Sequence, residues 1–67
     1  MTDTYYIPEP NTIKNHRLRA ELTQGECAQL VCVTQATWAR WEKGQTNMPA
    51  GLWKLFIIEK SVHHVLS

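Results

Sequence analysis

The fold is decided by residues 23–44, which read TQGECAQLVCVTQATWARWEKG. Thr23 is followed three residues later by Glu26, and this reciprocal capping pair satisfies two otherwise orphaned amides at the start of a helix. Thr34 is a second good N-cap, and Gly44 suits the left-handed position just past a helix end. The stretch therefore predicts two short helices that are joined by a turn of about three residues.

Further helices are expected on both sides of this unit. Asn11 and Thr12 can cap a first helix that runs to about Glu21. Pro49 at a first helical position opens a fourth helix over roughly residues 49–60, with several large apolar side chains. Because no strand pattern and no internal repeat is evident, the sequence predicts a compact all-α fold of four to five helices.

The length of the chain allows one domain. Its 67 residues, of which 43% are hydrophobic, leave no room for a second core. Residues 11–60 are expected to form the domain and residues 61–67 a C-terminal tail. Residues 1–10 have no helical or strand period and are expected to form an extended arm, which is either disordered or packed back on the core through Tyr5, Tyr6 and Ile7.

Composition predicts a soluble cytoplasmic protein. No apolar run approaches the ~20 residues that span a bilayer. Because no signal peptide is evident, Cys27 and Cys32 are expected to be reduced thiols rather than a disulfide. The net charge of +1 gives weak support for a nucleic-acid partner, and the distribution of charge matters more. Four basic residues fall within the periodic middle of the chain: Arg17, Arg19, Arg40 and Lys43.

Three short motifs occur together between residues 12 and 50. Arg17 precedes the pattern T-Q-x-E-x-A of residues 23–28, a V-T-Q turn follows at residues 33–35, and W-E-x-G closes the unit at residues 41–44. In combination they resemble the helix-turn-helix of the Cro/CI-type (Xre) phage and plasmid repressors. The resemblance implies a lambda-repressor-like DNA-binding domain.

Two features of the sequence differ from the usual pattern of that family. Cys32 stands where the family usually has Gly in the turn, so this residue must tolerate an unusual backbone angle or the turn must differ slightly. Trp38 and Trp41, together with residues 47–49 (Asn-Met-Pro), look closer to small mobile-element autorepressors, including regulators associated with anti-CRISPR operons.

A helix that reads DNA lies in the major groove with its N-terminal residues toward the base edges. The candidates for base readout are Gln35, Ala36, Thr37 and Arg40. Gln pairs with adenine, Arg with guanine, and small apolar groups contact the methyl group of thymine. Two alternatives stay open: Arg40 contacts a phosphate or covers Trp41, and Gln35 fills the helix start without touching a base.

Contacts to the DNA backbone are expected from four polar residues: Gln24, Lys43, Gln45 and Asn47. The resemblance implies the contact of Gln24, whereas the other three are candidates by position and can equally be solvated loop residues. The resemblance also implies an ion pair between Arg17 and Glu42 that fixes the first helix against the reading helix.

The fourth helix carries more apolar residues than a small bundle can cover, and a surplus apolar face marks an interface. We therefore expect a homodimer that binds an inverted-repeat operator in double-stranded DNA, and the resemblance implies autorepression. The expected interface residues are Trp53, Phe56, Ile57, Val62, Val65 and Leu66. Trp38, in contrast, is expected to lie between the two helices of the motif.

Catalysis finds little support in the sequence. The three histidines show no metal-ligand spacing with the cysteines, and no nucleophile with a base is recognisable, so we expect no enzyme activity, metal, cofactor, small-molecule substrate or membrane partner. The main alternative is a protein-interaction module, such as an antitoxin or adaptor, that uses the same helices as a scaffold. A second alternative is a DNA-binding protein without sequence preference.

Overall fold

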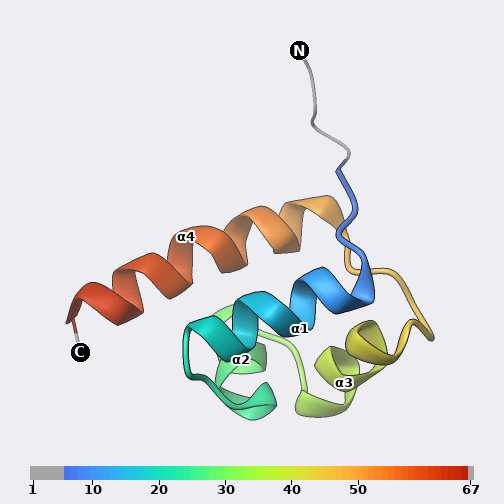
Figure 1. The fold of residues 1–67 in the computed structure, drawn as a ribbon, viewed down its shortest axis with the longest axis horizontal. Helices are drawn as coiled ribbons and strands as arrows, with labels where there is room; N and C mark the ends of the chain where they lie inside the picture. The colour runs from blue at the N-terminus through green and yellow to red at the C-terminus, as the bar shows by residue number, and fades with distance from the viewer. Residues whose placement is uncertain (1–5, 67) are drawn as a thin grey trace.

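The structure is a computed structural model that describes residues 6–66, and it describes the surroundings of side chains as far as residue 62. Four helices occupy this range: α1 (Pro10–Arg19), α2 (Gln24–Leu30), α3 (Gln35–Lys43) and α4 (Ala50–Leu66). Helix α3 packs against α2 and α1, and α2 packs against α4 (Figure 1). Since no strand occurs between residues 6 and 66, the all-α fold predicted from the sequence is confirmed.

The two helices of the central unit begin and end as their sequence predicts. Thr23 Oγ1 accepts from the amide of Glu26 at 3.1 Å, and the amide of Thr23 donates to Glu26 Oε1 at 2.8 Å. Thr34 Oγ1 accepts from the amide of Thr37 at 3.2 Å and caps α3. Gly44 ends α3 with a φ of 79°, in the left-handed region that glycine adopts without strain. These local signals therefore set where the two helices start and where α3 stops.

Helix α1 differs from the expectation at both ends. It begins at Pro10 rather than after Asn11 or Thr12, and its N-cap, Glu9, makes no side-chain capping bond. Proline suits the first helical turn because its fixed φ is already helical and its missing N–H would have no partner there. The helix ends at Arg19, and the chain then turns through a left-handed residue, Glu21, with a φ of 60°. The predicted cap was therefore wrong.

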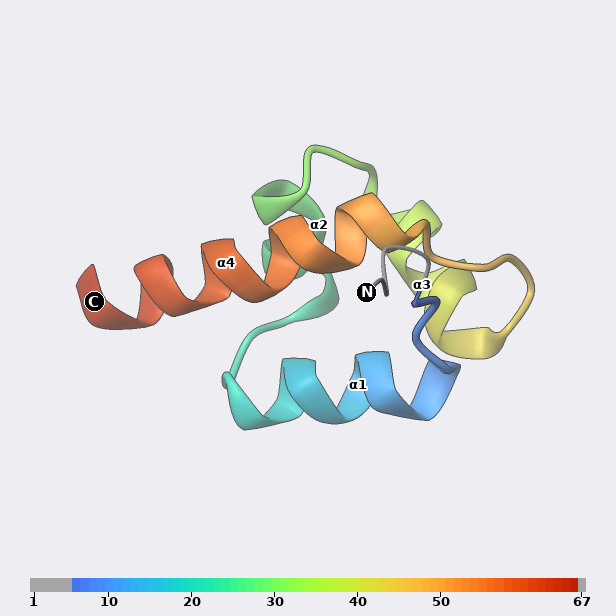
Figure 2. The same cartoon turned by 90° about the horizontal axis from the view of Figure 1, so that it is seen from above.

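Helix α4 is longer than the predicted range of residues 49–60. Pro49 lies just before the first helical residue, and its carbonyl accepts from the amide of Trp53 at 3.0 Å. The helix continues through residues 61–66, and Ser61 donates its hydroxyl to the carbonyl of Ile57 at 3.0 Å, one turn back. The C-terminal part of α4 extends beyond the other three helices in both views (Figure 1, Figure 2).

The turn between α2 and α3 uses a left-handed cysteine. Cys32 has a φ of 61°, a conformation that costs L-residues roughly 1–2 kcal/mol relative to the right-handed region. The following amide, that of Val33, donates to the carbonyl of Ala28 at 3.0 Å and closes the end of α2. Of the two alternatives for this position, the structure thus shows the unusual backbone angle.

The core is built around Trp38, whose side chain is fully buried. Its ring centroid lies 4.9 Å from that of Phe56 and 5.6 Å from that of Trp41, both in edge-to-face geometry. The other buried apolar residues are Ile13, Leu22, Cys27, Ala28, Val31 and Met48. Trp38 therefore joins α3 to α4, and the core contains residues from all four helices.

The described part of the arm before α1, residues 6–9, packs back against the helices. Pro8 is buried, whereas Tyr6 and Ile7 are about half exposed. The ring centroid of Tyr6 lies 6.4 Å from that of Trp53 on α4, in a tilted arrangement. Residues 6–9 thus contact the core without forming a helix, while Tyr5 lies outside the described residues.

Candidate nucleic-acid interface

The outer face of α3 carries polar and small side chains. Gln35, Ala36, Arg40 and Lys43 are exposed, whereas Trp38 on the opposite face is fully buried. The spacing of Ala36, Arg40 and Lys43, four and then three residues apart, aligns them along one side of the helix. The first turn of α3, and the side of α3 that carries these three residues, are therefore free to enter a groove of a nucleic-acid duplex.

Thr37 is the half-buried member of the predicted reading set. Its hydroxyl lies 2.9 Å from that of Thr34, with either atom able to donate, so the two capping threonines are hydrogen-bonded to each other. Because the hydroxyl of Thr37 is already engaged, its methyl group is the part that remains for an apolar contact with a base.

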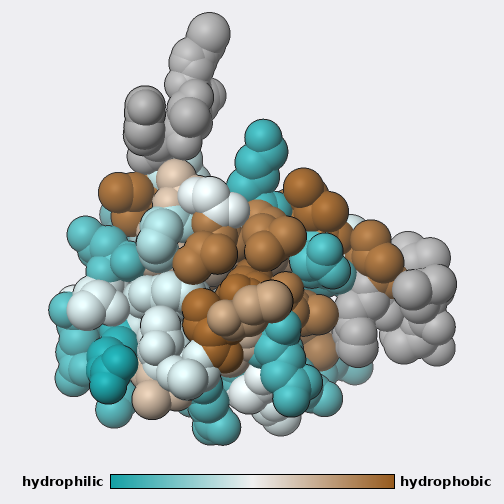
Figure 3. All heavy atoms as spheres, turned by 180° about the vertical axis from the view of Figure 1, so that it is seen from behind, coloured by the Kyte–Doolittle hydropathy of each residue, from teal (hydrophilic) through white to brown (hydrophobic). Residues whose placement is uncertain are grey.

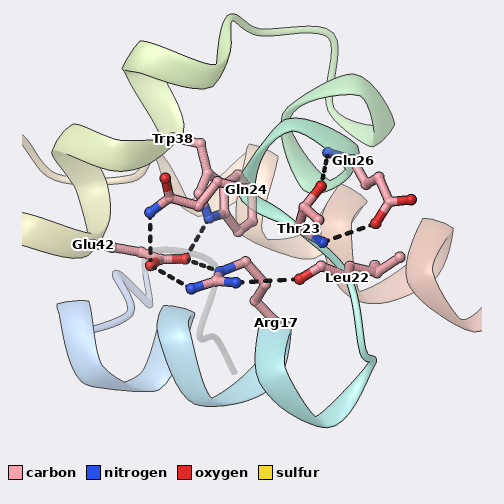
Figure 4. A network of polar contacts seen from close by, with 7 residues as sticks. All are labelled: Arg17, Leu22, Thr23, Gln24, Glu26, Trp38 and Glu42. Atoms are coloured by element: carbon pink, nitrogen blue, oxygen red, sulfur yellow. Dashed lines mark hydrogen bonds and ion pairs between the residues drawn. The ribbon is translucent and has the colours of Figure 1, made fainter.

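Gln24 occupies the first position of α2, and its side chain points toward α3. Its Nε2 donates to Oε1 of Glu42 at 3.1 Å (Figure 4). A primary amide has two N–H donors, so one remains on the same nitrogen for an outside acceptor. Gln24 is thus held in place by Glu42 before any ligand arrives.

The loop after α3 holds the remaining predicted contact residues. Gln45 and Asn47 are exposed, and the amide of Gln45 donates to the carbonyl of Arg40 at 3.0 Å. Met48 is fully buried and anchors the end of the loop in the core. The loop therefore presents polar side chains from a backbone that is fixed at both ends.

Glu42 is the centre of a polar network that links α1, α2 and α3 (Figure 4). Its Oε2 accepts from Arg17 Nε at 2.7 Å and from the indole Nε1 of Trp38 at 2.6 Å. Its Oε1 accepts from Arg17 Nη2 at 3.2 Å and from Gln24 Nε2 at 3.1 Å. Arg17 Nη1 donates in addition to the carbonyl of Leu22 at 3.2 Å. Arg17 and Glu42, which the resemblance predicts to form an ion pair, are therefore in direct bidentate contact.

The electrostatics of this network favour the charged forms of both ions. Burial alone would raise the pKa of Glu42, but the hydrogen bonds from Arg17, Trp38 and Gln24 outweigh it and hold that pKa below its ordinary value. The hydrogen bond to Glu42 raises the pKa of Arg17 further. The exposed fractions of the two side chains are only 14% for Arg17 and 6% for Glu42, so water screens the pair weakly.

The predicted interface residues on α4 fall into different environments. Phe56 is fully buried against Trp38 in the core, so it offers no surface to a second copy, and its assignment to an interface was wrong. Trp53 and Ile57 are half-buried, and Val62 is exposed. The side chains of Val65 and Leu66 lie outside the described set.

Apolar side chains nevertheless gather over α4 on the face turned away from the viewer of Figure 1, as Figure 3 shows. Ile58 and Val62 are about half exposed, and Leu55 is partly buried beside the core. These three residues are spaced three and then four positions apart, so they share one side of the helix. We call Leu55, Ile58 and Val62 the apolar stripe of α4.

The cysteines are both free thiols. Cys27 is fully buried, which raises the pKa of its thiol to about 12, whereas Cys32 in the turn is exposed. Within the described part of the chain, no group of three His, Cys, Asp or Glu residues could hold a metal ion. None of the helices described is both long and apolar enough to span a bilayer.

Sequence reasoning missed two relationships at this surface. The indole N–H of Trp38 bonds the carboxylate one turn later, and the i, i+4 spacing of Trp38 and Glu42 was the signal for it. Gly25 lies directly beside the side chain of Gln35, and no local pattern indicates this, because the two residues belong to different helices.

Comparison with known proteins agrees with this architecture. The sequence pattern of a family described as a helix-turn-helix domain matches residues 11–57, a range that covers most of α1, all of α2 and α3, and the first part of α4. No curated protein matches the chain.

Proposed function

Because the chain belongs to the helix-turn-helix domain family, we propose that it is a sequence-specific transcription regulator that reads double-stranded DNA in the major groove with the first turns of α3. The observation that carries the proposal is the division of α3 into two faces. Trp38 and Trp41 are buried in the core, while Gln35, Ala36 and Arg40 are exposed on the other side.

Direct readout is assigned to the exposed residues of α3. Gln35, at the first helical position, suits a paired contact with adenine, and Arg40 suits a paired contact with guanine one turn further along. Ala36 and the methyl group of Thr37 suit a thymine methyl group. Since Arg40 makes no ion pair with another described residue, its guanidinium is available to DNA.

Contacts to phosphates are assigned to the residues that flank this helix. Lys43 at the end of α3 carries the charge, and Gln45 and Asn47 add hydrogen-bond donors from the anchored loop. Gln24 contributes the second N–H of its amide while Glu42 holds the first. These contacts set the register of α3 on the duplex and carry no base information.

We further assign the apolar stripe of α4 to a homodimer interface. A single reading helix offers few base contacts, and a two-fold axis doubles them on an inverted repeat whose half-sites lie about one helical turn apart. The stripe lies on α4, whereas the reading residues lie on α3, so the two surfaces are formed by different helices. A dimer of this kind that binds its own promoter is an autorepressor.

The test of the reading function is a selection of random duplex DNA on the purified protein. We expect a palindromic site to be enriched, and its binding to fall steeply with salt because several phosphates are neutralised. Arg40→Ala should relax preference at one symmetric position at a cost of about 1–3 kcal/mol. Lys54→Ala, which removes an exposed positive charge from α4, is the matched control and should leave that preference unchanged. If no sequence is enriched at any salt concentration, the proposal fails: salt-sensitive binding to every duplex would indicate a DNA-binding protein without sequence preference, and no binding to DNA would indicate a protein partner.

The test of the dimer is sedimentation equilibrium of the free protein. Ile58→Glu places a charge in the middle of the apolar stripe and should shift the protein to the monomer. Asn15→Glu introduces the same charge at an exposed position of α1, away from the stripe, and should leave the dimer intact. A wild-type protein that stays monomeric at all concentrations, alone and on DNA, would remove the dimer from the proposal while leaving the reading helix untouched.

A further inference from the structure

Gly25, the second residue of α2, faces the first residue of α3. A Cβ atom at position 25 would lie 3.3 Å from Oε1 and 3.8 Å from Cδ of Gln35. The carboxamide of Gln35 therefore packs against the face of Gly25 where another residue would carry its side chain. Among the described glycines, a positive φ occurs at Gly44 and not at Gly25, so the backbone of Gly25 is that of an ordinary helical residue. What glycine supplies at this position is space rather than conformational freedom.

The surroundings of that space are fixed by other contacts. Gln24 is tied to Glu42 through its Nε2 at 3.1 Å, and Thr23 is tied to Glu26 by the capping pair. Thr23 Oγ1 lies 3.9 Å from the same Cβ position at residue 25. The exposed side chain of Gln35 therefore lies against the first turn of α2 at the one residue there that has no side chain of its own.

We propose that Gly25 is a specificity-determining residue, because the space beside it sets where the carboxamide of Gln35 stands in the major groove. The proposal rests on the proposed function and deepens it, since it names a residue that acts on a base pair through Gln35 without touching DNA. A paired contact to adenine needs both hydrogen bonds near 2.9 Å, so a shift of the carboxamide by a few tenths of an ångström weakens one of them.

The substitution Gly25→Ala isolates this effect. A contact of 3.3 Å to a Cβ atom is tight, and the atom that must yield is the far end of a flexible, exposed side chain rather than backbone. The fold therefore accepts the methyl group, and Gln35 moves. Alanine also favours a helix over glycine, so the melting temperature should stay the same or rise by about 2–5 °C.

Gly51→Ala is the matched control. Gly51 is also the second residue of its helix, it is exposed, and a Cβ there would meet nothing within 4 Å. The two variants gain the same helix-forming side chain at the same helical position. They differ in whether that side chain meets Gln35.

The experiment compares selected DNA sites for the wild-type protein, Gly25→Ala, Gly51→Ala, Gln35→Ala and the double variant Gly25→Ala/Gln35→Ala. The base pair that Gln35 reads is the one whose preference is lost in Gln35→Ala. We expect Gly25→Ala to change preference at that base pair by about tenfold and at no other, and to add nothing in the Gln35→Ala background. In free protein, the side-chain amide resonances of Gln35 should shift in Gly25→Ala and stay in place in Gly51→Ala.

The possible outcomes distinguish a failure of this inference from a failure of the proposed function. If the wild-type protein selects a site and Gly25→Ala selects the same one with unmoved Gln35 resonances, the role of Gly25 is wrong and the reading function stands. If Gly25→Ala weakens all sites equally, also without Gln35, the glycine serves close approach of the backbone to DNA and the inference is overturned. If the wild-type protein selects no site, the proposed function fails and the inference fails with it.

Discussion

The indole N–H of Trp38 donates to Oε2 of Glu42, 2.6 Å away and one helical turn later on α3. The same oxygen accepts from Arg17 on α1, and the other carboxylate oxygen accepts from Gln24 on α2. A carboxylate that is nearly buried is tolerated because donors from three helices compensate its lost hydration. The position of α3 relative to its neighbours therefore depends on one side chain.

Removal of Glu42 should lower stability strongly. Glu42→Ala leaves Arg17 with a poorly hydrated, uncompensated charge, which we expect to cost about 3–5 kcal/mol in the free energy of unfolding. Since a loss of that size can unfold the chain, Glu42→Gln, which keeps the size and two of the accepting positions, is measured beside it by urea denaturation. Glu9→Ala removes an exposed carboxylate without a capping bond and should change stability by less than about 0.5 kcal/mol. Equal effects of Glu42→Ala and Glu9→Ala would contradict the role of the network.

The contribution of the Trp38 hydrogen bond can be separated from that of its ring. Trp38→Phe keeps an aromatic ring in the core but leaves Glu42 one donor short. Trp41→Phe makes the same change at a neighbouring buried ring whose indole has no hydrogen bond to another described residue. We expect Trp38→Phe to cost about 1–2 kcal/mol more than Trp41→Phe in chemical denaturation. If the two variants lose equal stability, the bond to Glu42 contributes nothing net.

Replacement of Cys32 by glycine should stabilise the fold. Its φ of 61° disfavours any residue with a Cβ, so Cys32→Gly relieves that cost but also frees the unfolded chain. We expect a net gain of about 0.5–1 kcal/mol in the free energy of unfolding, seen as a higher midpoint in guanidinium with an unchanged slope. Val33→Gly, one residue later in the same turn and not left-handed, should destabilise instead. A loss of stability in Cys32→Gly would contradict this prediction and show that the freedom gained by the unfolded chain outweighs the relief of the left-handed residue.

The parts of the fold that were predicted from sequence are those encoded locally. The capping pair of Thr23 and Glu26, the cap at Thr34 and the left-handed Gly44 each involve residues within four positions of one another. Their geometry requires no knowledge of the rest of the chain. The boundaries of the central helices could therefore be predicted before the structure was known.

The parts that were missed depend on which residues meet across helices. Phe56 lies on a helix with apolar residues on several sides, and only the contact with Trp38 decides that it is core rather than surface. The proximity of Gly25 and Gln35 likewise follows from the angle between α2 and α3. Periodicity gives the faces of a helix but not the neighbour of each face.

The two cysteines should react at very different rates with a thiol reagent. Burial raises the pKa of Cys27 to about 12 and shields its sulfur, so the reactive thiolate is scarce and inaccessible in the folded protein. Cys32 is exposed and should react fully at pH 8. We expect Ellman's reagent to titrate one thiol in native protein and two in guanidinium. In Cys32→Ser the native reaction should vanish, and a second fast thiol in the native wild type would contradict the buried position of Cys27.

His16 should make the stability of the fold fall on mild acidification. Its ring packs edge-on against Trp53 with centroids 5.0 Å apart, and its Nδ1 is buried without a hydrogen-bond partner in the described structure. Burial, and after it the charges of Lys60 and Arg19, lower the pKa of His16 below its ordinary value near 6.5.

The sign of the effect follows from proton uptake. As the pH falls below about 6.5, the unfolded chain binds a proton at His16 that the folded chain does not, so the free energy of unfolding decreases until the folded-state pKa is reached. The depressed pKa of Glu42 acts at lower pH, because the stability that the charged carboxylate contributes is lost only as the pH falls below about 4.5 and through the folded-state pKa.

The substitution His16→Phe keeps the aromatic contact with Trp53 and removes the titrating group. In urea denaturation across pH 3–8, His16→Phe should flatten the pH dependence of the free energy of unfolding below pH 6.5 and retain the loss below pH 4.5, while His63 and His64 remain in both proteins. An unchanged slope in His16→Phe would assign the mild-acid sensitivity to those two histidines instead.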